Sequence, residues 1–171
     1  MINSPDGMPP TTTAQAVAAR QTQQGGNWFY WIAALSAINA VLLLTHSPVS
    51  LMFGLGATDA LTAVGSGIGG AGLAVALAVT AVLAGVIALF GVFASRGARW
   101  AFVAGMAVYA LDGLLSLSFK QYLEAAVHAY ALFRIFQGFQ AAGQLAALRA
   151  QEIAAIPPGT TPGVWPPPPS L

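Results

Sequence analysis

The sequence predicts an all-α integral membrane protein with four transmembrane helices, a short interfacial helix on the outer side, and disordered tails at both ends. Charged residues make up only 6% of the 171 residues, and hydrophobic residues make up 57%. A soluble domain carries about 25% charged residues to solvate its surface. Mean hydropathy is +0.71, and four apolar stretches are each long enough to cross a bilayer, which takes about 17–25 helical residues.

The N-terminal segment 1–27 is rich in Pro, Thr, Gln and Gly, which predicts a disordered tail. The first span follows at about 28–45. Trp28, Tyr30 and Trp31 at its start are typical of an aromatic anchor at a membrane interface. The polar leader is long and no A-x-A site follows the span, so we expect an uncleaved anchor and not a signal peptide.

The other three spans are expected at about 70–94, 100–119 and 122–148. Residues 49–68 are nearly long enough to cross the bilayer, but four glycines and Asp59 weaken a helix there. We interpret this segment as an interfacial helix, and a fifth span is the alternative.

The C-terminal segment 150–171 contains four consecutive prolines, which predicts an extended polyproline II tail. Such a tail is a candidate ligand for an aromatic-lined groove of a partner. We expect it to be a solvated cytoplasmic tail.

The positions of the basic residues predict the orientation. With four spans, Lys120 alone lies on one side, and the other side carries Arg20, Arg96, Arg99 and Arg149. Because basic residues are enriched on the cytoplasmic side, both termini are expected there. With five spans, Arg20 would move to the outer side.

Helical spacing predicts which faces pack together. Asn39 lies on a stripe with Ile32 and Ser36, where a polar side chain would bond to a neighbouring helix. Small residues at alternating steps of four and three form a heptad seam in the second span, which predicts close, left-handed packing: Ala74, Ala78, Ala81, Gly85 and Ala88. On the third span, one inward face is formed by Ala101, Gly105, Tyr109, Asp112 and Ser116.

Two charged residues, Asp112 and Arg134, fall inside apolar spans, where an ionised side chain costs about 3 kcal/mol near the bilayer centre. A hairpin turn near Lys120 places Asp112 at the depth of His128, with Arg134 deeper and able to reach it by snorkelling. We therefore expect Asp112 to pair with Arg134, with His128 or with both, and Arg134 to be its counter-ion. Glu124, four residues before His128, completes the intramembrane polar cluster.

The sequence assigns no catalytic residue, metal ligand set or cofactor. Cysteine is absent, no H-E-x-x-H spacing occurs, and Gly65-Ser66-Gly67 lacks the spacing of a nucleophile elbow. Five ionisable residues fall in the outer half of the predicted bundle, where they could relay protons or bind a metal: His46, Asp59, Asp112, Glu124 and His128. Our favoured interpretation places Glu124 and His128 at the water interface, while Asp112 neutralises Arg134.

The phrases WFYWIAALSAINAV, GMAVYALDGLL and HAYALFRIFQGFQA resemble a group of small bacterial four-span membrane proteins of unknown function, over residues 28–148. This resemblance implies a bacterial cytoplasmic (inner) membrane and brings no activity with it. We expect a non-enzymatic accessory or scaffold protein that interacts with the lipid bilayer and with other membrane proteins or a second copy of itself. A net charge of +1 gives no field that would attract nucleic acid. Two alternatives stay open: a small proton, ion or solute carrier that uses the intramembrane ionisable residues, and an outer-face metal-binding site.

Overall fold

The computed structural model describes residues 13–44, 64, 65 and 67–155, and these contain no β-strand. Four long helices account for most of them: α1 (Thr13–Leu44), α3 (Gly70–Ser95), α4 (Arg99–Ser118) and α5 (Tyr122–Ala154). The predicted all-α fold class is confirmed. The bounds of α3 and α4 agree with the second and third predicted spans to within one residue at each end.

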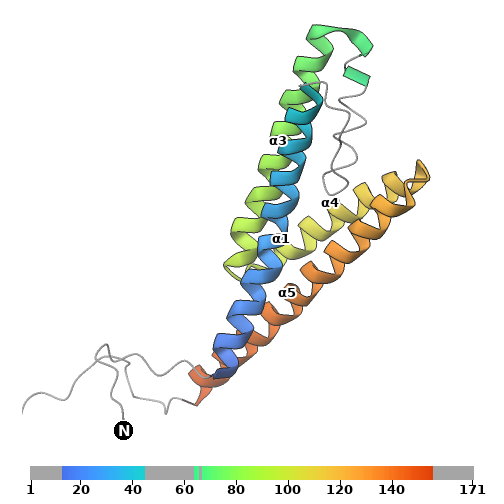
Figure 1. Ribbon diagram of the computed structural model, residues 1–171. Helices are drawn as coiled ribbons and strands as arrows, with labels where there is room; N and C mark the ends of the chain where they lie inside the picture. Colours follow the sequence, from blue (N-terminus) through green and yellow to red (C-terminus); the bar gives the residue numbers. More distant parts are fainter. Residues whose placement is uncertain (1–12, 45–63, 66, 156–171) are drawn as a thin grey trace, which may run out of the picture.

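Helix α1 packs against both α3 and α5, and α4 packs along α5 (Figure 1). The helices of each pair run antiparallel, and the α1–α3 pair diverges from the α4–α5 pair toward the ends that carry Gly70 and Ser118 (Figure 1). The buried core lies where the four helices meet, and its largest side chains include Phe29, Phe102 and Ile135.

Two tight turns produce the antiparallel order. Gly97, between α3 and α4, has a φ of 87°, which glycine adopts without steric cost. Lys120, between α4 and α5, has a φ of 61° in the left-handed region. A non-glycine residue there costs about 1–2 kcal/mol, and the short turn fixes the register in which α4 and α5 face each other.

The N-terminal part of the molecule departs from the sequence prediction. Helix α1 begins at Thr13, so the prediction of a disordered tail over 1–27 is wrong for residues 13–27; residues 1–12 lie outside the described part of the chain. Ala, Arg and Gln favour a helix here, and tertiary contacts stabilise it: Ala18 and Thr22 are buried, and Gln15 Nε2 donates to Glu152 Oε2 at 2.9 Å.

The glycines that suggested disorder are instead sites of close helix approach. A Cβ atom added to Gly25 would lie 2.5 Å from the Cα atom of Gly138 on α5, and one added to Gly26 would lie 2.6 Å from the Ser95 nitrogen. Such distances exclude any side chain. The Gly25–Gly138 contact therefore lets α1 and α5 approach backbone to backbone.

The C-terminal part differs in the same way, because α5 continues to Ala154, beyond the predicted start of the tail at 150. Residues 156–171 lie outside the described part of the chain, as do His46, Asp59 and nearly all of the predicted interfacial segment 49–68.

The predicted small-residue seam faces the wrong way. Ala78, Ala81 and Gly85 are exposed, and so is Ala74. The buried face of α3 consists of Ala76, Thr80, Ala84, Ile87, Gly91 and Ala94. Small residues occupy several faces of this helix, so spacing alone does not select one. The face that packs is the one that contributes Ile87 to the core and lets the Tyr30 ring lie against Gly91.

Among the described residues, α3 and α4 are the two helices that are long and apolar enough to cross a membrane. Length and composition alone support this assignment. Helix α5 is more polar, because it carries Glu124, His128 and Arg134 together with several glutamines. The structure thus supports a helical protein with two candidate membrane-spanning helices.

Candidate functional site

The inward face predicted for α4 is confirmed. Ala101, Gly105, Tyr109, Asp112 and Ser116 are all buried, together with Phe102. Gly105 is required there because the Phe29 ring of α1 occupies the space that a Cβ would take. Asn39 and Ser36, the polar residues of α1 that were predicted to face a neighbouring helix, are also buried.

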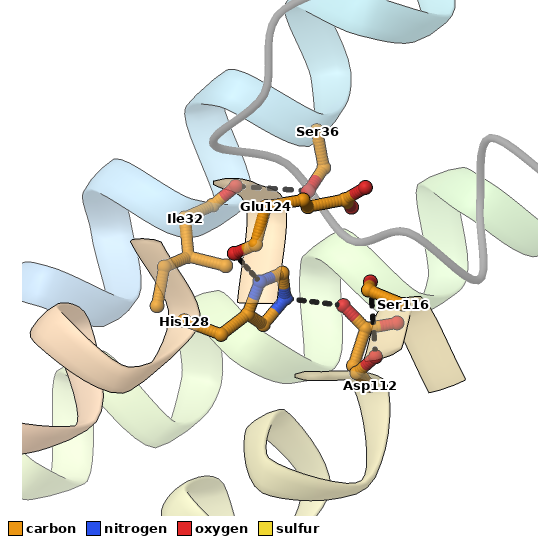
Figure 2. A network of polar contacts seen from close by, with 6 residues as sticks. All are labelled: Ile32, Ser36, Asp112, Ser116, Glu124 and His128. Atoms are coloured by element: carbon orange, nitrogen blue, oxygen red, sulfur yellow. Dashed lines mark hydrogen bonds and ion pairs between the residues drawn. The ribbon is translucent and has the colours of Figure 1, made fainter. Parts of the chain in front are cut away.

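The structure brings Asp112 and His128 together across the α4–α5 hairpin (Figure 2). His128 Nε2 lies 2.8 Å from Asp112 Oδ2, and both side chains are almost fully removed from solvent. The hairpin turn at Lys120 places the two residues at the same level, as the sequence predicts. His128 is buried, however, and does not lie at an exposed helix end as the favoured interpretation expected.

The second ring nitrogen of His128 fixes the protonation of the pair. Nδ1 lies 2.9 Å from the main-chain carbonyl oxygen of Glu124. A carbonyl oxygen only accepts, so Nδ1 carries a proton and donates it. One further proton is then shared between Nε2 and Oδ2, which gives either an imidazolium with a carboxylate or a neutral imidazole with a protonated carboxyl group.

Both forms of the pair have zero net charge. A neutral pair avoids most of the cost of burying an isolated ion in an apolar medium. This neutrality explains how an aspartate can be placed at a buried position of an apolar helix.

Neighbouring groups enclose the pair. The Tyr109 ring stacks on the imidazole, with centroids 4.3 Å apart and an interplanar angle of 21°. A Cβ on Gly113 would lie 2.9 Å from His128 Cβ, so this glycine allows α5 to approach α4. Ser116 Oγ donates to the main-chain carbonyl oxygen of Asp112 at 3.2 Å (Figure 2). On α1, Ser36 Oγ donates to the main-chain carbonyl oxygen of Ile32 at 2.9 Å.

Glu124 joins the cluster through its backbone, and its side chain is half-buried. The predicted proximity of Glu124 and His128 is therefore realised as a main-chain hydrogen bond. Within the described residues, no three His, Cys, Asp or Glu side chains come together in a way that could hold a metal ion.

Arg134 does not pair with Asp112 in the described part of the chain, so the prediction that it is the counter-ion is wrong. Its Nη1 donates to Gln137 Oε1 at 3.1 Å. Six residues separate Arg134 from His128, which is about 240° of helical rotation. The guanidinium therefore faces a different neighbour, a groove between α1 and α5.

This groove was not predicted from the sequence. Its polar lining consists of Gln21, Gln24, Arg134, Gln137, Gln140 and Gln144. Glutamines spaced by three and four residues on two helices were the available signal, but those of α1 were assigned to a disordered tail.

Comparison of the chain with protein-family models, with curated proteins and with solved structures finds no match. What the site does is therefore inferred from its own geometry. A buried, internally satisfied carboxylate–imidazole pair joins two helices of a bundle, and neither groove that Arg134 lines includes Asp112, Glu124 or His128.

Proposed function

We propose that the chain is a small integral membrane protein that acts without catalysis, as an accessory or scaffold subunit that binds another membrane helix. In this proposal four helices cross a bacterial inner membrane: α1 from about residue 28, α3, α4, and α5 to about residue 148. Both termini lie in the cytoplasm, because Arg96, Arg99 and Arg149 then face the cytoplasmic side.

The observation that carries the proposal is the open small-residue seam of α3. Ala74, Ala78, Ala81 and Gly85 repeat at heptad spacing and are exposed, and a Cβ on Gly85 would meet no atom of the described residues within 4 Å. Small residues gain little from facing lipid, whereas they let two helix backbones approach closely. A second helix packed on this seam would make use of the spacing.

The Asp112–His128 pair has a structural role in this proposal. It joins α4 to α5 within the chain and leaves the seam of α3, on another helix, available for the partner. The partner is a second copy of the chain or a different membrane protein.

Site-specific photo-crosslinking in native membranes tests the proposal. A photoreactive residue at Ala81 should give a discrete protein adduct, whose mass distinguishes a second copy from another protein. The matched control is Leu114, an exposed apolar residue of α4, which should crosslink to lipid. Lipid adducts alone at both positions would overturn the proposal.

The membrane placement has its own test. The chain contains no cysteine, so each introduced cysteine is the only thiol. Arg96→Cys should react with an impermeant thiol reagent only after the inner face is exposed, and Gln121→Cys should react from the outside. Equal reactivity of both from one side would contradict the four-span arrangement.

A further inference from the structure

Arg134 lines two adjoining grooves on the α1–α5 side of the molecule. One, of about 280 Å³, has the polar lining of glutamines described above. The other, of about 620 Å³, is lined by Asn27, Trp31 and Leu35. Gln24, Trp28 and Arg134 line both grooves, so a polar compartment and an apolar compartment meet at the guanidinium.

The charge of the polar groove favours an anion. Among the described residues, its lining contains one cation, Arg134, and no carboxylate. A guanidinium has five N–H donors in a planar fork that matches a phosphate. Its Nη1 donates a hydrogen bond to Gln137 Oε1, and the surrounding glutamine amides can donate further hydrogen bonds to phosphate oxygens.

The order of the two grooves along α1 matches the direction of a lipid molecule. The polar groove is lined by α1 residues 21–28, and the apolar groove by residues 24–35. In the proposed orientation α1 enters the bilayer from the cytoplasm at about Trp28. A headgroup at Arg134 would therefore lie toward the cytoplasmic side, and an acyl chain would follow Trp31 and Leu35 into the bilayer for about 10 Å.

The depth of Arg134 agrees with this arrangement. Tyr122 marks the outer end of α5, and Arg134 follows it by twelve residues, a distance of about 18 Å along the helix. The Gly25–Gly138 contact places residue 138 of α5 level with the cytoplasmic start of the α1 span. Arg134 lies four residues before Gly138, about 6 Å along the helix, so its long side chain can extend toward the inner headgroups. The cytoplasmic leaflet also has a negative surface potential that arises from its anionic lipids.

We propose that the groove between α1 and α5 binds one anionic phospholipid of the inner leaflet, with its phosphate on Arg134 and an acyl chain against Trp31 and Leu35. This proposal rests on the membrane placement given above and is independent of the partner helix on α3.

Native mass spectrometry of the full-length protein, released from micelles that contain equal amounts of phosphatidylglycerol and phosphatidylcholine, tests the proposal. We expect one retained phosphatidylglycerol, preferred over phosphatidylcholine by at least about tenfold. Equal retention of the two lipids by the wild-type chain would overturn the proposal without any variant. This readout is separate from the crosslinking at Ala81, so either proposal can fail alone.

Variants assign the retained lipid to the groove. Arg134→Gln should abolish the preference for phosphatidylglycerol, while Arg149→Gln, a charge removed from the same helix outside both grooves, should preserve it. Gln140→Leu removes a glutamine amide from the polar groove and should weaken the retention of phosphatidylglycerol. This variant tests the groove independently if Arg134→Gln folds poorly. Unchanged preference in Arg134→Gln would contradict the assignment.

The apolar half of the site is tested with Leu35→Ala, which should reduce retention of long-chain phosphatidylglycerol, against Leu114→Ala, which should leave it unchanged. Inorganic phosphate at the same concentration should not displace the lipid. Displacement by phosphate would show a simple anion site and would overturn the lipid assignment.

Discussion

His128 Nε2 and Asp112 Oδ2 meet at 2.8 Å between the two arms of the α4–α5 hairpin. Because Nδ1 of the same ring already donates to the Glu124 carbonyl oxygen, the pair shares one proton and is neutral in either form. A single hydrogen bond thus neutralises a carboxyl group and joins two helices whose register is fixed by the turn at Lys120.

Removing the carboxyl group should destabilise the fold. Asp112→Ala leaves a buried imidazole without its partner, and such a loss costs about 1–3 kcal/mol. Asp112→Asn should cost less, about 1 kcal/mol, because the new amide can donate to a neutral Nε2. Unfolding in mixed micelles, followed by circular dichroism during titration with dodecyl sulfate, gives both values. If the Ala variant is as stable as the wild-type chain, the pair has no structural role.

The contact between α1 and α5 should tolerate no side chain. Gly138→Ala would place a Cβ 2.6 Å from the Gly25 Cα atom, and overpacking of this kind costs about 1–3 kcal/mol. The matched control is Gly85→Ala on α3, where the new methyl group would contact none of the residues that the structure describes. That change should be neutral or stabilising by up to about 1 kcal/mol, since alanine is the better helix former. Equal stability losses in the two variants, measured by the same titration, would contradict the packing described here.

Residues 13–27 should be protected as a helix. Amide hydrogen exchange followed by mass spectrometry should show slower exchange there than in an unstructured peptide of the same sequence, because Ala18 and Thr22 are buried and Gly25 lies against Gly138 of α5. Gln15→Ala, which removes the hydrogen bond to Glu152, should increase exchange near Thr13 and leave the Gly25 region unchanged. Exchange at the peptide rate throughout 13–27 would restore the original interpretation of this segment as a disordered tail.

The features that follow from local spacing were predictable from the sequence. The inward face of α4 and the level of His128 depend only on helical periodicity and on a short hairpin, so His128 could be predicted as one of two candidate partners of Asp112, although Arg134 was the expected counter-ion. The turn at Lys120 and the near-uniform apolar character of α3 and α4 made those helix ends equally clear.

Features that depend on tertiary contacts were not predictable in the same way. Gly25 and Gly26 lower helix propensity, and only the approach of Gly138 and Ser95 explains why they lie inside a helix. The packed face of α3 was missed because small residues occur on several of its faces. Arg134 was assigned to Asp112 on depth alone, whereas rotation around α5 turns it toward the glutamines of α1.

The central claim is that Asp112 and His128 stabilise the bundle through each other. A double-mutant cycle of Asp112→Ala, His128→Ala and the double variant, with unfolding free energies measured in the same micelles, tests it most directly. We predict a coupling energy of about 1–2 kcal/mol, in the upper range for polar contacts between membrane helices. If the two single-variant losses sum to the loss of the double variant within about 0.5 kcal/mol, the claim is contradicted.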